Sequence, residues 1–388
     1  MSTLPHSNWN YPTTIWFGNN RIAELPEACA QLGMQRPLFV TDEGLVALDI
    51  VQDTLALLAD AKFETGLYSD VKGNPTGTNV AGGVTQFREG GHDGVIAFGG
   101  GSAMDAAKSI ALVAGQSHSL WDFEDLGDNW RKAEEAAIAP VIAVPTTAGT
   151  GSEVGRAAVI LDEAAHSKKI IFHPKMLPGI VISDPTLTVG LPPHITAWTG
   201  IDALVHAVEA YCAPGFHPMA DGIALEAIHT IGSALPRAFS KGADLEARGR
   251  MLAAASMGAT AFQKGLGCIH SLSHTLGALY DIHHGLANAI LLPYGLAMNR
   301  DAIDDRMQHL CRVLSLPGND TQGFIDYVVE LRAALDIPHT LADFAIEPQR
   351  ATEIGELALK DPSTAGNPRP VTAEELSRCF IDAVNGEL

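Results

Sequence analysis

Short apolar runs alternate with helix-length segments through the first half of the chain, and this alternation constrains the fold more than any other feature. The runs are rich in Val, Ile and Phe, and they predict strands at residues 37–42, 63–68, 94–101, 140–147 and 179–185. Amphipathic spacing between them predicts helices at 51–61, 78–89 and 102–114. Strands separated by helices pair in parallel, because each helix carries the chain back across the sheet. The first half therefore predicts an α/β domain, a parallel sheet with helices on both faces.

The sequence changes character after residues 191–193. Strand-like runs nearly vanish, and long segments rich in Ala and Leu with helical spacing follow at 195–211, 219–239, 245–262, 269–280 and 323–335. This change predicts a domain boundary near residue 190, with an α/β domain over residues 1–190 and an all-α domain over residues 191–388.

Composition excludes several classes of protein. The chain has 388 residues, of which 46% are hydrophobic and 18% charged, as in globular proteins of two or three domains. Its 45 acidic and 25 basic residues give a formal net charge of −20. Nucleic acids and anionic membranes are bound by clustered Lys and Arg, so neither partner is expected.

The cysteines and the apolar runs bear on location. The five cysteines are far apart and lack CxxC spacing, which argues against a disulfide framework and a thiolate zinc site. No segment combines basic residues, an apolar run and a small-residue cleavage site, and no run of about 18 apolar residues occurs. We therefore predict a cytoplasmic protein.

Two glycine-rich turns follow predicted strands. GVIAFGGGSAMDAAK has the strand–glycine–helix order that lets a helix N-terminus bind phosphate, although Met104 stands where the third glycine of GxGxxG belongs. PTTAGTGSE offers hydroxyls and glycines that suit diphosphate oxygens. Each turn taken alone is also compatible with a purely structural role. A nucleophilic serine is disfavoured, because Ser102 and Ser152 each lack one glycine of GxSxG.

Asp42 closes the first clear strand. A carboxylate there accepts hydrogen bonds from a ribose diol and repels a 2′-phosphate, which favours NAD over NADP. A solvated helix cap is the alternative interpretation. Ligands of open α/β sheets lie beyond the carboxyl ends of the strands, and Asp42 and both turns are placed there, which favours a nucleotide site.

The second half contains histidines in apolar helical segments. Asp202 and His206 are four residues apart and so share a helical face, as do His270 and His274, and His284 follows. A lone pair of this kind is more often structural, but two pairs and a further histidine favour a metal. One carboxylate and up to four imidazoles suit Fe²⁺, Zn²⁺, Mn²⁺ or Co²⁺.

In their order along the chain, the motifs resemble those of the iron-containing (group III) alcohol dehydrogenase family, whose fold is like that of dehydroquinate synthase. The matching motifs are VTDEGL, GNPT, GGGSAMDAAK, PTTAGTGSE, ISDPTLT, TGIDALVHAVEAY, GCIHSLSH and HHGLANA. They cover nearly the whole chain and are specific as a set. The resemblance implies a dinucleotide-binding domain over residues 1–190, a metal-binding and catalytic domain over residues 191–388, and a metal in the cleft between them.

The resemblance also implies roles for individual residues. The metal, Fe²⁺ or alternatively Zn²⁺, would be bound by Asp202, His206, His270 and His284. His274 would sit near the nicotinamide and help with proton transfer, and His283 would be structural or support the ligands. The cofactor contacts would be Asp42, Asn74, Gly99, Gly100, Gly101, Ser102, Thr146, Thr147, Lys168 and Leu187.

One cofactor residue is ambiguous. Lys169 competes with Lys168, because the register after HSKK is uncertain by one residue. The family resemblance further implies a homodimer or a larger homo-oligomer.

The expected activity is metal-dependent, NAD-linked hydride transfer between nicotinamide and a small primary alcohol or aldehyde. Lys264 and Arg156 stand where relatives carry small residues, which favours a substrate with a carboxylate, such as a hydroxy acid or semialdehyde. The alternative is that both cations pair with local acids. A dehydroquinate synthase-like metal- and NAD-dependent lyase is the first rival function, a metallohydrolase is a weaker one, and a non-catalytic nucleotide-binding module ranks lowest.

The remaining isolated histidines have no motif around them. We expect them at the surface: His6, His92, His118, His173, His217, His309 and His339.

Overall fold

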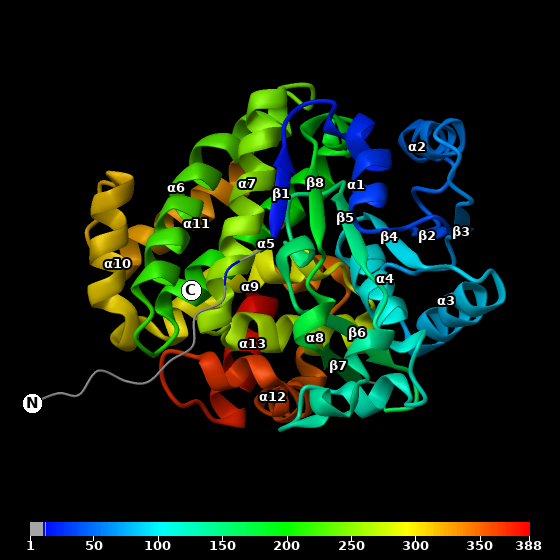
Figure 1. Cartoon of the computed structure of the whole chain (residues 1–388). Coiled ribbons are helices and arrows are strands. Elements are labelled where there is room, and N and C mark those ends of the chain that lie inside the picture. Colours follow the sequence, from blue (N-terminus) through cyan, green and yellow to red (C-terminus); the bar gives the residue numbers. More distant parts are fainter. Residues whose placement is uncertain (1–10, 12, 166) are drawn as a thin grey trace, which may run out of the picture. The chain divides into compact units, whose positions relative to one another are not determined.

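The computed structural model describes residues 11, 13–165 and 167–388. Backbone contacts divide it into two compact units, Pro12–Gly190 and Leu191–Leu388, and Tyr11 is grouped with the second unit. In Figure 1 the first unit runs from blue to green and the second from green to red. Each unit has its own core, and each is described by itself below.

The first unit contains a six-stranded sheet in the order β1-β8-β5-β4-β2-β3, in which every neighbouring pair is parallel. The strands are β1 (Thr14–Phe17), β2 (Pro37–Val40), β3 (Gly66–Tyr68), β4 (Gly94–Gly99), β5 (Val141–Pro145) and β8 (Ile180–Ser183). The predicted parallel sheet is confirmed. β1 is a further strand, which the sequence pattern did not reveal because it is short and mostly exposed.

Alternating strand residues build a core on each face of this sheet. Leu38 and Val95 point to one face, where they pack with side chains of α3 (Gly77–Glu89) and α4 (Gly101–Val113). Phe39 and Ile96 point to the other face and meet α1 (Leu25–Gln31) and α2 (Asp49–Asp60). Because both faces are apolar, the strands read as continuous hydrophobic runs. The predicted helices on both faces are therefore confirmed.

A separate antiparallel hairpin follows β5. It consists of β6 (Ala157–Asp162) and β7 (Ser167–Phe172). The sequence analysis did not predict it, since β7 carries two lysines and its residues are mostly half-buried, which weakens the apolar pattern.

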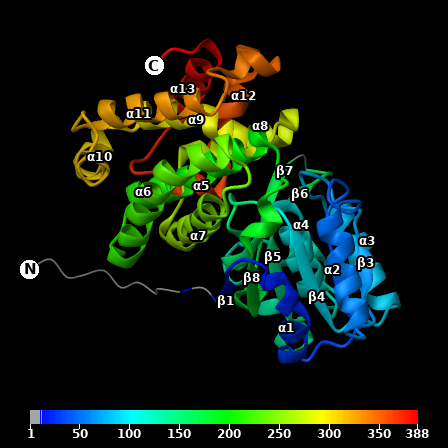
Figure 2. The same cartoon turned by 90° about the horizontal axis from the view of Figure 1, so that it is seen from above.

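The second unit is mostly helical, and none of residues 191–388 forms a strand. Its helices are α5 (Pro193–Cys212), α6 (Pro218–Ser240), α7 (Leu245–Ala261), α8 (Cys268–Tyr280), α9 (His284–Met298), α10 (Arg300–Leu314), α11 (Thr321–Ala334), α12 (Ala351–Lys360) and α13 (Ala373–Asn385). Figures 1 and 2 show α5 among the other helices, and it packs on α6, α7 and α9. From Thr199 to Cys212 every residue of α5 is buried, so the helix is enclosed on all sides.

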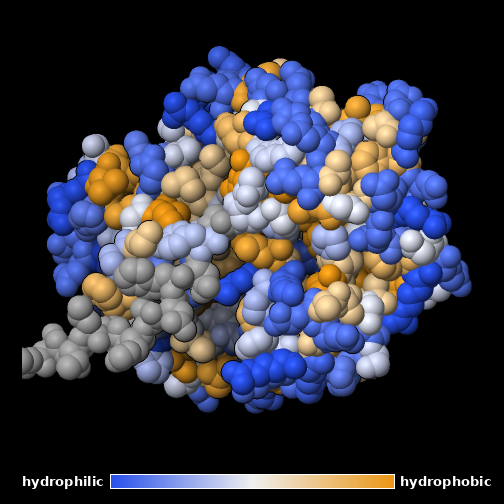
Figure 3. Space-filling view, in the orientation of Figure 1, coloured by the Kyte–Doolittle hydropathy of each residue, from blue (hydrophilic) through white to orange (hydrophobic). Residues whose placement is uncertain are grey.

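Figure 3 shows hydrophilic side chains across much of one face, with apolar side chains in separate patches. Among the helices of the described residues, none has the length and apolar character needed to cross a membrane. All five cysteines are buried and unbridged.

Candidate functional site

The glycine-rich turn after β4 has the geometry of a phosphate-binding turn. Gly99 has a φ of +148°, a conformation that side chains rarely adopt. Gly100 precedes α4 and makes no side-chain cap, so the first-turn N–H groups of α4 have no capping side chain. A Cβ atom on Gly101 would clash with the Thr150 side chain, so the two predicted turns pack directly on each other.

The second turn is joined to the first by its backbone. Thr146 N–H donates to the carbonyl oxygen of Gly99 at 3.0 Å. Thr147 Oγ1 would lie 3.3 Å from a Cβ atom on Gly100. The two turns therefore form one surface at the carboxyl edge of the sheet, where α/β proteins bind their ligands.

Asp42 lies beside this surface, just after β2. Its Oδ1 accepts hydrogen bonds from the N–H groups of Gly44 (2.9 Å) and Leu45 (3.0 Å), so it does cap the following turn. Its Oδ2 would lie 3.4 Å from a Cβ atom on Gly99. Burial raises the pKa of Asp42, and the two backbone hydrogen bonds oppose that rise. One carboxylate oxygen thus fixes the local fold, and the other faces the glycine turn.

Three other predicted cofactor residues, Asn74, Ser102 and Leu187, lie in the segments after β3 and β8 or in the first turn of α4. Ser102 Oγ donates to the carbonyl oxygen of Gly73, which places the segment of Asn74 against the glycine turn. Leu187 lies in the short turn Pro185–Thr188 after β8 and is 7% exposed. All of them belong to one end of the sheet.

The two lysines of β7 are in different environments. Lys169 Nζ lies 3.0 Å from Asp162 Oδ2 and 3.4 Å from Glu124 Oε2, and it also sits over the ring of Trp121. Successive residues of a strand point to opposite faces, so Lys168 projects to the other side of the hairpin. Lys169 therefore belongs to a local ion-pair cluster with Asp162 and Glu124.

The metal candidates converge in the second unit. Asp202 and His206 of α5 and His270 of α8 are buried, and each offers a donor atom within 4.8 Å of the other two. His284, the first residue of α9, brings its Nε2 to 3.6 Å from Asp202 Oδ1. The His206 ring stacks on the His270 ring with centroids 4.6 Å apart. All four residues come together.

Neighbouring polar groups orient two of these imidazoles. Glu209 Oε2 lies 2.6 Å from His270 Nδ1. Ser273 Oγ lies 2.9 Å from His284 Nδ1 and also donates to the His284 carbonyl oxygen. Because a carboxylate only accepts hydrogen bonds, His270 carries its proton on Nδ1 and presents an Nε2 lone pair to Asp202.

The contacts of Asn288 indicate that this donor set suits a cation. Its Nδ2 lies 2.7 Å from Asp202 Oδ1, 3.2 Å from His270 Nε2 and 3.1 Å from His284 Nε2. An amide nitrogen has two hydrogens and cannot serve three acceptors, and the buried Asn288 Oδ1 has no hydrogen-bond partner. Three acceptors thus point at one positively polarised atom, and a cation would satisfy all of them. The residues fit a divalent metal bound through oxygen and nitrogen.

The charge around the cluster is negative. Burial lowers the pKa of His270, but the hydrogen bond and charge of Glu209, together with Asp202 and Asp361, outweigh burial and leave the pKa raised. A field that favours a proton on this imidazole equally favours a metal cation beside it.

His274 lies one turn after His270 and has a carboxylate of its own. Its Nδ1 lies 3.0 Å from Asp361 Oδ2, and its ring stacks on His284 with centroids 5.2 Å apart. Burial raises the pKa of Asp361, but His274 and the hydrogen bonds of Ser363 outweigh it, so the pKa is lowered. Asp361 is therefore ionised, and it leaves His274 Nε2 as the nitrogen able to exchange a proton.

The other histidines depart in part from expectation. His283 is exposed and packs against Trp198, in keeping with a structural role. The surface location predicted for His173 and His217 is wrong, because both are buried and their Nδ1 atoms accept backbone hydrogen bonds from Lys175 and Ala220 at the starts of helical segments. His6 lies outside the described residues.

Of the two cations predicted to meet a substrate, Lys264 is already paired within the helical unit. Lys264 Nζ lies 2.5 Å from Asp221 Oδ1 and 3.2 Å from the Tyr211 carbonyl oxygen, with its side chain 2% exposed. The Arg156 guanidinium lies over the Phe172 ring, and its charge lowers the pKa of Asp125 against the effect of burial. Local pairing, the alternative weighed above, describes Lys264, and the role of Arg156 stays a prediction.

Several functional residues escaped the sequence analysis. Glu209 follows Asp202 by seven residues and Asn288 follows His284 by four, so helical spacing alone places them on the ligand faces. No local signal points to Asp361, which reaches His274 across 87 residues of sequence.

A parallel sheet with a phosphate-type turn and a helical unit with a buried carboxylate–imidazole cluster are typical of a metal-dependent dehydrogenase. Residues 12–185 match the family described as iron-containing alcohol dehydrogenase, and residues 196–384 match the C-terminal region of the Fe-containing alcohol dehydrogenase family. The chain belongs to the iron-containing alcohol dehydrogenase family.

Three similar proteins illustrate the relationship. The 4-hydroxybutyrate dehydrogenase of Cupriavidus necator is 39% identical over 95% of this chain and 97% of its own. The NAD-dependent methanol dehydrogenase of Bacillus methanolicus is 32% identical over 97% of this chain and 100% of its own. A crystal structure of 1,3-propanediol oxidoreductase superposes with a TM-score of 0.92 at 34% identity, covering 97% of this chain and 100% of that one.

These matches confirm the predicted family, fold class and activity. The chain is an oxidoreductase, an alcohol dehydrogenase of the iron-containing type. The lyase alternative is not favoured by them.

The pairing of Lys264 leads to a test. We expect Lys264→Met to lower the stability of the protein by about 1–3 kcal/mol, because it leaves Asp221 with Arg306 alone at 3.3 Å. Thermal unfolding measures this change. Lys175→Met, which removes an exposed pair with Glu135, should have little effect and serves as the control. Unchanged stability with a raised KM for carboxylate substrates alone would restore Lys264 as a substrate residue.

Proposed function

We propose that this protein catalyses NAD-dependent, metal-dependent interconversion of a short primary alcohol and its aldehyde, with a carboxylate at the far end of the substrate. The observation that carries the proposal is the convergence of Asp202, His206, His270 and His284 in the core of the helical unit. A buried carboxylate surrounded by imidazoles is costly unless it binds a cation.

The proposed metal ligands are the Asp202 carboxylate and the imidazoles of His206, His270 and His284. Fe²⁺ is the proposed metal and Zn²⁺ the alternative, since both accept mixed oxygen and nitrogen ligands. The convergence of acceptors on Asn288 Nδ2 supports this assignment.

The proposed cofactor is NAD, bound at the carboxyl edge of the sheet. Gly99, Gly100, Gly101 and Ser102 would receive the diphosphate, with Thr146 and Thr147 beside them. Asp42 would face the adenosine ribose, where its charge disfavours a 2′-phosphate. Asn74, Lys168 and Leu187 are the further contacts proposed. Lys168 is preferred over Lys169 because the two lysines project to opposite sides of the hairpin and Lys169 turns toward Asp162 and Glu124.

When bound, the metal supplies Lewis acidity toward the substrate oxygen, and the nicotinamide supplies or accepts the hydride. Within the protein, His274 carries the proton that the substrate oxygen gains or loses. Asp361 holds the His274 ring through Nδ1, so that the proton is exchanged at Nε2. Asp361 and its backbone partner Ser363 thus fix both the tautomer and the direction of the general acid–base group.

The substrate class rests on the relatives. One relative is named a 4-hydroxybutyrate dehydrogenase and a similar structure is a 1,3-propanediol oxidoreductase, so both names specify a short primary alcohol with a second polar end. Lys264 is not proposed to bind this polar end, because its ammonium is paired with Asp221, whereas Arg156 stays a candidate. The cytoplasmic location and the homo-oligomeric state remain predictions.

The first experiment follows NADH oxidation by chelator-stripped protein, with and without added Fe²⁺, using succinic semialdehyde, 3-hydroxypropanal and butanal. We expect turnover only after Fe²⁺ is added and the highest kcat/KM with succinic semialdehyde, because the metal site is complete only when occupied. If butanal is the best substrate, the proposal of a substrate carboxylate is wrong, whereas the proposed dehydrogenase activity is supported. Activity that survives stripping, or NADH oxidation with none of the aldehydes, would refute the metal-dependent proposal.

The lysines of β7 form a matched pair. Lys168→Met should weaken NADH binding about tenfold or more, since it removes a cation proposed to face the cofactor. Lys169→Met should lower the unfolding temperature and spare NADH binding, because it leaves Asp162 and Glu124 together without their cation. Fluorescence titration and thermal unfolding separate the two, and the reverse pattern would transfer the role to Lys169.

Asp361→Asn tests the proton path. We expect kcat to fall on the order of 10²-fold with NADH affinity and metal content unchanged, because an amide can donate to Nδ1 and stabilise the wrong tautomer of His274. In a His274→Ala background the same substitution should add little. A full additional loss in that background would show that Asp361 acts independently of His274.

A further inference from the structure

We propose that Glu209 is a positioning residue for the metal: it fixes the tautomer and direction of His270 and thereby prepares the site to bind the cation. This inference rests on the metal site proposed above. It concerns a residue that does not itself bind the metal, and its effect acts through His270.

Glu209 contacts His270 directly and fixes the position of its ring proton. Glu209 Oε2 lies 2.6 Å from His270 Nδ1, and both side chains are buried. A carboxylate accepts and cannot donate, so the imidazole proton stays on Nδ1. His270 Nε2 then carries the lone pair, and this atom lies 3.9 Å from Asp202 Oδ1 and 3.2 Å from Asn288 Nδ2. The nitrogen needed by a metal is the one turned toward the other ligands.

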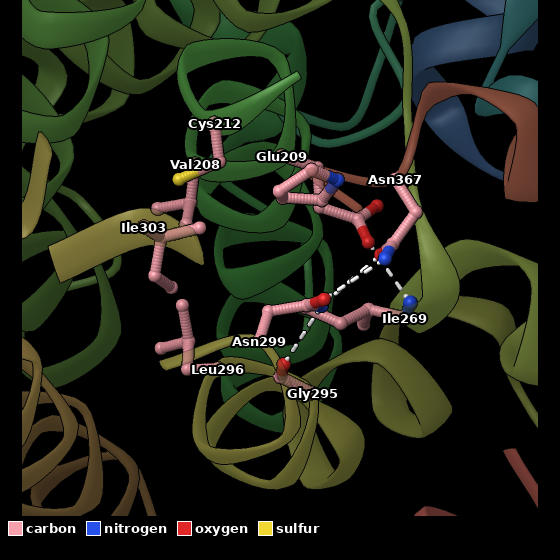
Figure 4. Close-up of a pocket in the computed structure, with 10 residues that line it drawn as sticks. Val208, Glu209, Cys212, Ile269, Gly295, Leu296, Asn299, Ile303 and Asn367 are labelled. Atoms are coloured by element: carbon pink, nitrogen blue, oxygen red, sulfur yellow. Dashed lines mark hydrogen bonds between the residues drawn. The ribbon is translucent and has the colours of Figure 1, made fainter. Parts of the chain in front are cut away.

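Glu209 is itself held rigidly. Its Oε1 accepts a hydrogen bond from Ile269 N–H at 2.9 Å, at the start of α8 (Figure 4). α8 makes no side-chain cap from its own N-cap residue, Gly267, so Glu209 caps it from another helix. The positive end of α8 also stabilises the charge of the carboxylate. Each oxygen of Glu209 thus has a fixed partner.

The residues around Glu209 confine its carboxylate to these two hydrogen bonds. A Cβ atom on Gly267 would lie 2.9 Å from Glu209 Oε1, so a side chain there would push the carboxylate away. A cavity of about 20 Å³ lies beside Glu209, and none of the residues that line it is a cation. No side-chain ammonium or guanidinium of this lining competes for the carboxylate. Its charge is directed to His270 and the helix end.

A second polar pair stabilises the start of the same helix. Asn367 Oδ1 accepts a hydrogen bond from Cys268 N–H at 3.2 Å. Asn367 and Asn299 exchange hydrogen bonds of 3.0 and 2.8 Å (Figure 4). The first two N–H groups of α8 are therefore fixed, one by Asn367 and one by Glu209. The backbone that carries His270 cannot rotate without breaking them.

Helical spacing gives Glu209 its place. It follows Asp202 by seven residues and His206 by three, so all three share one face of α5. A single buried helix thereby presents two ligands and the group that orients a third. Removal of a carboxylate that hydrogen-bonds to a metal ligand typically lowers the metal affinity by about 10–100-fold.

The test measures binding of Co²⁺ to the full-length, chelator-stripped protein by competition with a chelator, and records the absorption spectrum of the Co²⁺ protein. Glu209→Gln keeps the shape but replaces one acceptor with a donor, so it cannot accept from both Ile269 N–H and His270 Nδ1–H. We expect a loss of Co²⁺ affinity of about 10–100-fold and an altered spectrum. Glu209→Asp keeps the charge but is too short to reach His270, and the same loss is expected.

Cys212→Ala is the matched control. Cys212 lines the same cavity on the next turn of α5 and makes no contact with the ligands among the interactions described, so wild-type Co²⁺ affinity is expected. Thermal unfolding of the metal-free variants checks folding, and Glu209→Asp decides the matter if Glu209→Gln does not fold.

The outcomes separate this inference from the proposed function. One Co²⁺ bound by wild type and a weakened, spectrally altered site in the Glu209 variants support the inference. Wild-type affinity in both variants would overturn the positioning role while leaving the metal site intact. Failure of the wild-type protein to bind one Co²⁺ would overturn the metal site and this inference together.

Discussion

The burial of Asp202 is the constraint on which the helical unit depends. Asp202 is 1% exposed within a helix enclosed on all sides, and a buried charge is tolerated only when partners compensate it. The partners come from other helices: His270 from α8, and His284 and Asn288 from α9. Hydrophobic packing alone would allow these helices to pack in many relative positions. The Asp202 carboxylate is compensated in only one of these arrangements, in which its partners face it.

The same polar network supports the proposed binding of a cation. The amide of Asn288 shares two hydrogens among three acceptors while its own oxygen stays without a hydrogen bond, so the polar network is only partly satisfied. A protein built for stability alone would gain from an apolar core at this place. The presence of an undersatisfied acid and imidazoles in such a core therefore supports the metal site proposed above.

Sequence patterns predicted the elements whose environment is uniform along the chain. Strands buried on both faces and helices with one apolar side follow from local periodicity, and so does the pairing of Asp202 with His206 on one face of α5. The patterns missed β7, whose lysines obscure its alternation, and placed His173 and His217 at the surface, because an imidazole that accepts a backbone N–H looks like any other isolated histidine. They also assigned Lys264 to the substrate, since its partner Asp221 is 43 residues away and only the fold brings it to the ammonium.

His270 and His274 show why long-range partners decide function here. They have the same side chain, one turn apart on α8, and each places its Nδ1 against a carboxylate. Glu209 comes from α5 and Asp361 from the segment after α12, so the two rings are turned 70° from each other. One ring thereby directs Nε2 to the proposed metal ligands, and the other keeps Nε2 for the proposed proton exchange. The local sequence supplies two equivalent imidazoles, and two distant carboxylates make them different.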